Sequence, residues 1–128
     1  MKIQYANYIE IVPAYAVDSI SGDSITLKSG YTIDKFSTMN NFQPDESSKD
    51  NDAGVLYEFK ASAGVDKFTD TLKQKYGNRC SVILTIFQND GQVKKVVGSS
   101  DNPVQMIWTP APEYDSLSFS RNSIFAVL

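Results

Sequence analysis

Four carboxylates in one polar segment are the residues of this chain best suited by type to chemistry. Asp45, Glu46, Asp50 and Asp52 follow one another closely, and two carboxylates held at a fixed separation can act as general acid and base. The surrounding residues 37–54 have neither strand nor helix periodicity, which predicts a long exposed loop. Because such a loop fixes neither the separation of two carboxylates nor their pKa values, we expect no catalytic residues and no enzyme.

The same segment faintly resembles the start of a calcium-binding loop at Asp50–Gly54. An EF-hand loop needs an oxygen ligand at position 5, glycine at position 6 and glutamate at position 12. Counted from Asp50, those positions hold Gly54, Val55 and Ala61, so the pattern fails. Zinc and copper sites draw on histidine and cysteine, and the chain has no histidine and one cysteine. We therefore expect no metal site and no cofactor.

The single cysteine, Cys80, stands at the head of the apolar run 80–84. One cysteine cannot form an intrachain disulfide. A nucleophilic thiol would want a histidine base, which the chain lacks. Because free cysteine is among the most buried residue types, we expect Cys80 to be a small buried hydrophobe.

Composition predicts one globular domain over residues 1–128. Hydrophobic residues make up 41% of the chain and charged residues 21%, which is ordinary for a globular protein. A chain of 128 residues can bury enough surface to fold without a metal or a disulfide.

The charge distribution argues against sequence-specific binding of nucleic acid. The formal net charge is −3 and the sequence pI is about 4.8. Lys73, Lys75 and Arg79 are spread along one segment, and Lys94–Lys95 is the sole adjacent basic pair. Without a basic cluster an acidic surface repels DNA, so we expect no sequence-specific nucleic-acid binding.

Nothing in the sequence predicts a membrane segment or a targeting signal. No stretch approaches the roughly 18 apolar residues of a membrane span. Residues 1–12 mix polar and charged groups with apolar ones, unlike a signal peptide. We therefore expect the protein to be located in the cytoplasm, or inside a particle that it joins.

Short runs of alternating apolar and polar residues predict strands over most of the chain. The turn sequences at 21–23 and 89–91 are typical of hairpins. The predicted strands are 8–12, 14–20, 24–28, 31–36, 55–60, 81–87, 92–97, 104–109, 116–120 and a short apolar end at 124–128.

One segment, about 66–76, has helical periodicity. Its apolar stripe comprises Val65, Phe68, Leu72 and Tyr76. Gly77 is placed to end the helix. The stripe is expected to pack on the core. The fold class that follows is mainly β (α+β): a β-barrel or β-sandwich of about eight strands, with one flanking helix and the long loop 37–54.

Three segments carry a resemblance to a known group of proteins: Ile20–Tyr31, Asp50–Gly54 and Val93–Val104. They resemble small proteins of phages and prophages of Bacteroidetes, over roughly residues 15–125. Such proteins are similar to structural components of the virion tail or neck, of the tail tube, tail terminator or completion, or head–tail connector type.

The resemblance implies a function in assembly. It suggests a homo-oligomeric ring that contacts other tail or neck proteins, assembled in the host cytoplasm into the virion. DNA would pass through the lumen without base-specific contacts, and no membrane would be involved. The contacts would come from 38–54 and 121–128. Expected subunit-contact residues are Met39, Phe42, Asp45, Glu46, Asp50, Asp52, Arg121, Ile124 and Phe125.

Two alternatives remain open on the sequence. A small monomeric binding module could use residues 37–54 to hold a protein or glycan partner. A phage accessory protein would never enter the virion. Oligomeric state separates the first alternative from a virion subunit, and the peptide content of purified particles separates the second.

Overall fold

The computed structural model describes residues 6–42, 44–51, 54–88 and 93–123. In chain order its elements are β1 (Ala6–Pro13), the 3-10 helix η1 (Ala14–Ala16), β2 (Val17–Ser21), β3 (Ser24–Leu27), β4 (Asp34–Phe42), β5 (Asp45–Asn51), β6 (Gly54–Val65), α1 (Asp70–Tyr76), β7 (Arg79–Gln88), β8 (Val93–Val97), β9 (Val104–Thr109) and β10 (Asp115–Ser123). The expected class, mainly β with one α-helix, is confirmed.

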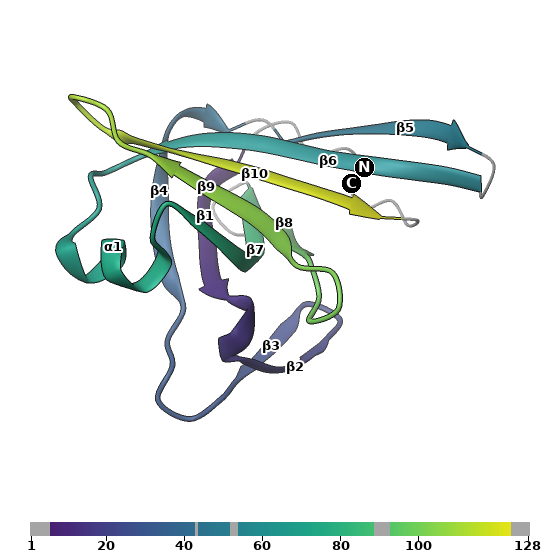
Figure 1. Ribbon diagram of the computed structural model, residues 1–128, viewed down its shortest axis with the longest axis horizontal. Coiled ribbons are helices and arrows are strands. Elements are labelled where there is room, and N and C mark those ends of the chain that lie inside the picture. The colour runs from purple at the N-terminus through teal and green to yellow at the C-terminus, as the bar shows by residue number, and fades with distance from the viewer. Residues whose placement is uncertain (1–5, 43, 52–53, 89–92, 124–128) are drawn as a thin grey trace.

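The main sheet folds over itself into two layers. One layer has the order β5–β6–β10–β9 and the other β4–β1–β7–β8, and every described pairing is antiparallel. The layers join where β7 leaves β1 and pairs with β9 through Arg79–Val82. Figure 1 shows β6 and β10 running across β1 and β4.

The sequence predicts either a β-barrel or a β-sandwich. The observed architecture is sandwich-like, not a closed barrel. On the side opposite the β7–β9 junction, β4 and β6 meet at one described residue pair, Met39 and Gly64. A closed barrel needs continuous pairing between all neighbouring strands. Here the two layers part instead, and β6 continues past β4.

The core lies between the two layers. Ile9 and Ile11 of β1, with Leu84 of β7, face Leu117 and Phe119 of β10, and none of these side chains is more than 2% exposed. Their spacing of two residues along each strand is the periodicity that places alternate side chains on one face. A second, smaller cluster around Val12 and Ile83 is covered by the β2–β3 hairpin.

The helix is shorter than expected, beginning at Asp70 and not near residue 66. The Thr69 hydroxyl accepts a hydrogen bond from the Leu72 N–H at 3.3 Å and so caps the first turn. Before the cap, the Phe68 N–H is held at 2.8 Å by the buried carboxylate of Asp115. This tether keeps the chain out of the helix until Thr69.

The core-packing stripe is nevertheless confirmed. Val65, Phe68 and Tyr76 are buried, and Leu72 packs against them. Gly77 ends the helix as predicted: its φ is 64°, a left-handed value that favours glycine, and its N–H donates to the Lys73 carbonyl at 2.8 Å.

The prediction of a long loop at 37–54 is wrong. Strand β4 continues to Phe42, and β5 occupies Asp45–Asn51 in a hairpin with β6. Most of the side chains of β5 are exposed on both faces, so the sequence shows no alternation to mark the strand. Its backbone is ordered by the ladder with β6, from the Asp45–Lys60 pair to the Asn51–Gly54 pair.

Candidate assembly surface

A protruding hairpin is the most conspicuous surface feature of the molecule. We define the arm as β5 together with residues 54–58 of β6. Figure 1 shows it extending beyond the rest of the sheet. In the described chain, β6 has β10 as a second partner only from Tyr57 onwards, so residues 54–56 pair with β5 alone. Among the described residues, the outer end of the arm therefore has two strands.

An apolar row leads from the core out onto the arm. Phe59 is 1% exposed and anchors the base of the row, Tyr57 is half-buried, and Val55 is 41% exposed. These residues alternate along β6 and therefore share one face. Glu46, Ser48 and Asp50 lie opposite them on β5, in that order. One face of the arm thus combines apolar and acidic side chains.

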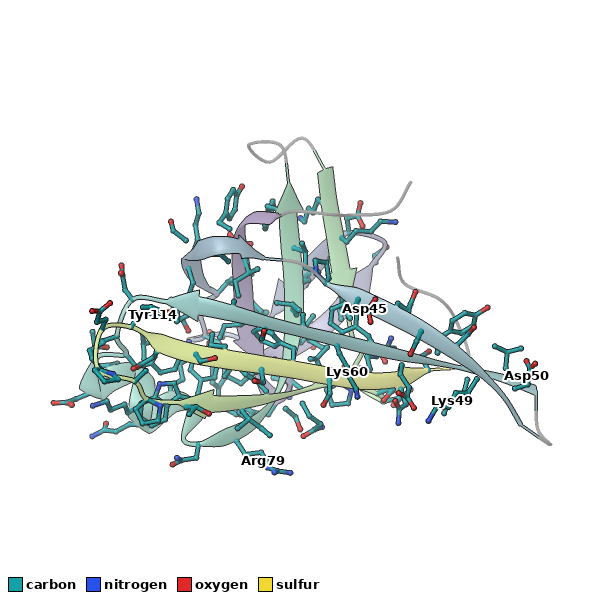
Figure 2. The ribbon with its side chains drawn as sticks, turned by 90° about the horizontal axis from the view of Figure 1, so that it is seen from above. Asp45, Lys49, Asp50, Lys60, Arg79 and Tyr114 are labelled. Atoms are coloured by element: carbon teal, nitrogen blue, oxygen red, sulfur yellow. The ribbon has the colours of Figure 1, made fainter. Side chains whose placement is uncertain are left out.

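The opposite face of the arm carries an ion pair. Lys49 Nζ lies 3.1 Å from Glu58 Oε1, with the lysine side chain 68% exposed. Such an exposed pair contributes little to stability. Figure 2 shows Asp45 near the base of the arm, with Lys49 and Asp50 towards its end.

A polar pocket of about 450 Å³ lies at the base of the arm. Arg121 Nε donates to the Asn102 carbonyl at 2.8 Å, and Asn102 Nδ2 donates to the Asn122 carbonyl at 2.7 Å. Burial lowers the pKa of Arg121, and the negative charge of Glu46 opposes that shift. The lining residues are Glu58, Lys60, Asn102, Pro103, Gln105, Ser120, Arg121 and Asn122.

The structure brings four of the expected contact residues into one region. Asp45, Glu46 and Asp50 lie on β5, and Arg121 on β10 is near enough to Glu46 to feel its charge. The pocket partners of Arg121, above all Asn102, were not anticipated, because the loop 98–103 reaches β10 only through the tertiary fold.

The remaining expected contact residues are not all described. Met39 and Phe42 belong to β4, where their backbones pair opposite Gly64 and Ala6, respectively. The structure does not describe their side chains. Asp52, Ile124 and Phe125 lie outside the described residues.

A buried carboxylate that sequence reasoning missed holds the helix end of the molecule together. Asp115 is 1% exposed, and it accepts hydrogen bonds from the Phe68 N–H and Trp108 Nε1, both at 2.8 Å, and from Lys67 Nζ at 3.3 Å. Burial alone would raise the pKa of Asp115, but these hydrogen bonds outweigh it and the pKa is lowered. With every donor supplied by its own chain, this site is structural.

A second polar cluster, around Asp34, is also supplied with donors by its own chain, and the thiol of Cys80 packs against the core. Asp34 accepts from Lys75 Nζ at 2.6 Å and from the Tyr76 hydroxyl. Burial, with the Asp34 carboxylate, raises the pKa of Tyr76. Cys80 is half-buried against the core, and burial raises the pKa of its thiol, which disfavours the reactive thiolate.

Within the described ranges, His, Cys, Asp and Glu nowhere gather in a group of three or more that could hold a metal ion. None of the described helices is long and apolar enough to cross a membrane. No protein-family model, curated protein or solved structure matches this chain.

Proposed function

We propose that the protein is a structural subunit of a phage virion, in the tail or neck, that acts by ring-like self-assembly. The observation that carries the self-assembly is the arm, a hairpin that projects past the core and exposes Val55 and carboxylates on its surface. In a monomer, projecting strands of this kind leave strand edges and apolar surface exposed to solvent. A subunit contact would bury both.

The place in a virion rests on the resemblance of Ile20–Tyr31, Asp50–Gly54 and Val93–Val104 to small phage proteins. The neighbours would be other tail or neck proteins, and no catalytic step, cofactor or membrane is part of the proposal. A net charge of −3 suits a ring through which DNA slides, because it offers few contacts to phosphates.

A second candidate is a monomeric binding module. The observation that favours it is the polar pocket at the base of the arm, whose lining includes Lys60, Gln105 and Arg121. Amide and cationic groups of that kind suit a glycan or an acidic peptide. Isothermal titration of acidic peptides and oligosaccharides, compared between the native chain and Arg121→Ala, tests this candidate.

Light scattering over a wide concentration range, with negative-stain images of any large species, tests the main proposal. Rings or tubes of constant diameter are expected. A monomer at every concentration would favour the binding module. An accessory protein would be recognised by the absence of its peptides from purified particles.

A further inference from the structure

Over the residues that the structure describes, the main sheet leaves two edges unpaired. Within the described ranges, β5 pairs only with β6, and β8 pairs only with β7. Each of these strands therefore has one row of backbone N–H and C=O groups that faces away from its own sheet. Such edges are templates for pairing with another strand.

The two open edges carry opposite charge. Strand β5 holds three carboxylates, Asp45, Glu46 and Asp50, against one lysine. That lysine is ion-paired with Glu58 of the neighbouring strand, and Glu46 already interacts with the charge of Arg121, so Asp45 and Asp50 carry the argument. Strand β8 has the sequence VKKVV, with two lysines and no carboxylate. Like charges placed opposite each other in a sheet are destabilising, whereas opposite charges attract. Pairing of β5 with β5, or of β8 with β8, is therefore disfavoured relative to pairing of β5 with β8.

A row of aromatic and basic side chains lies beside β8. The rings of Tyr8 and Phe87 are stacked with centroids 4.4 Å apart. Lys35 Nζ stands 4.0 Å from the Tyr8 centroid, and Lys94 Nζ stands 5.7 Å from the Phe87 centroid. Both rings are half-buried, so the row ends at the open edge with a cation above an aromatic face.

The arm offers the complementary side chains. Glu46 and Asp50 alternate on the face of β5 that it shares with Tyr57 and Val55 of β6. If β5 lay alongside β8, one face of the arm would continue the row of Phe87 and Lys94: the carboxylates of β5 would lie next to Lys94, and the apolar side chains of β6 would follow on the far side of β5.

We propose that β5 of one copy pairs with β8 of a second copy, so that the acidic arm of each subunit extends the sheet of its neighbour. This inference rests on the proposed self-assembly and names the two surfaces that carry it. Because the two surfaces differ, the contact is head-to-tail, which generates a ring when the rotation closes and a filament when it does not. Lysines on an edge also discourage unwanted pairing, and here they select an acidic strand over a second copy of β8.

Charge reversal tests the pairing. One variant carries Lys94→Glu with Lys95→Glu, and the other carries Asp45→Lys with Asp50→Lys. Each alone has two like-charged edges, so we expect half-assembly to need at least about tenfold more protein than the native chain. Mixed in equal amounts, each variant supplies the charge that the other lacks, and assembly returns. Light scattering at one moderate ionic strength measures all of these samples.

Matched controls make the result specific to the edges. Lys28→Glu with Arg79→Glu changes the net charge as much as the β8 variant does, at exposed positions outside both edges, and should assemble like the native chain. Circular dichroism checks that each variant is folded. Lys94→Glu alone, at an exposed position, replaces the double variant if half-buried Lys95 does not tolerate glutamate.

The outcomes separate this inference from the function on which it rests. Native assembly that persists in both reversed variants would overturn the β5–β8 contact and leave self-assembly standing. Folded variants that fail to assemble even when mixed would also overturn it. A native chain that stays monomeric at every concentration would overturn the proposed self-assembly, and this contact with it.

Discussion

Replacing Asp115 should be among the most costly single substitutions in this protein. Its carboxylate is buried and accepts from the Phe68 N–H, the Trp108 indole and Lys67. Asp115→Ala would leave the buried Phe68 N–H and the part-buried Trp108 indole N–H without an acceptor. An unsatisfied buried donor costs about 1–3 kcal/mol, so we expect a loss of about 3–5 kcal/mol in the free energy of unfolding, from these two donors, the lost Lys67 ion pair and the lost packing.

Urea unfolding followed by tryptophan fluorescence measures this loss. The shift should appear in the midpoint, with the slope of the transition unchanged. The exposed Asp18→Asn is the matched control, with an expected change within about 0.5 kcal/mol. A loss below about 1 kcal/mol in Asp115→Ala would refute the reasoning, because the donors would then have found water or another acceptor.

The same carboxylate predicts a pH dependence. Its pKa is lowered in the folded state, whereas the pKa of an aspartate in an unfolded chain is about 3.9. The folded state therefore prefers the charged form, and this stabilisation is complete above the unfolded pKa and is lost as the pH falls through the folded pKa. The non-titrating Asp115→Asn should differ most from the native chain near neutral pH, and the gap should narrow below about pH 4. A gap that stays constant from pH 7 to pH 3 would contradict this account.

Four further substitutions test the structure described above by the same unfolding measurement. Phe59→Ala, at the base of the arm, should cost about 3–5 kcal/mol because the side chain is 1% exposed, whereas Val55→Ser near its end should cost less than about 0.5 kcal/mol; similar losses would mean that the outer arm belongs to the core. Thr69→Ala removes the helix cap and should cost about 1 kcal/mol, and no change would show that the hydroxyl bond is dispensable. Gly98→Ala should destabilise by about 1–3 kcal/mol, since its φ is 105° and an added Cβ would lie 3.3 Å from Val104; an unchanged midpoint would show that the loop relaxes freely.

The elements that bury one face were predictable from sequence, and those without a buried face were not. Strand β9 has the predicted bounds, 104–109, because Val104 and Met106 alternate with exposed neighbours. Strand β5 was missed because most of its side chains are exposed on both faces, and among the described strands it pairs with β6 alone. Pairing with a neighbouring strand is a tertiary effect that overrides local pattern.

The candidate site was only partly predictable for the same reason. The carboxylates of residues 45–50 stand out by composition, and the pair Lys94–Lys95 stands out as the sole adjacent basic pair. That these two segments form the open edges follows from the strand order, which sequence patterns do not specify. Asp115 was overlooked because nothing near it in the chain indicates that its donors come from Phe68 and Lys67.

The most direct test of the central claim compares the solution mass of the native chain with that of an arm-shortened variant. Replacing residues 49–56 by the dipeptide Asn-Gly joins Ser48 to Tyr57, which already face each other, through a two-residue hairpin turn. Light scattering across a wide concentration range should show large species of constant size for the native chain, and a folded monomer for the shortened one. A native chain that remains monomeric, or a shortened chain that assembles as well as the native one, would contradict an arm-mediated assembly.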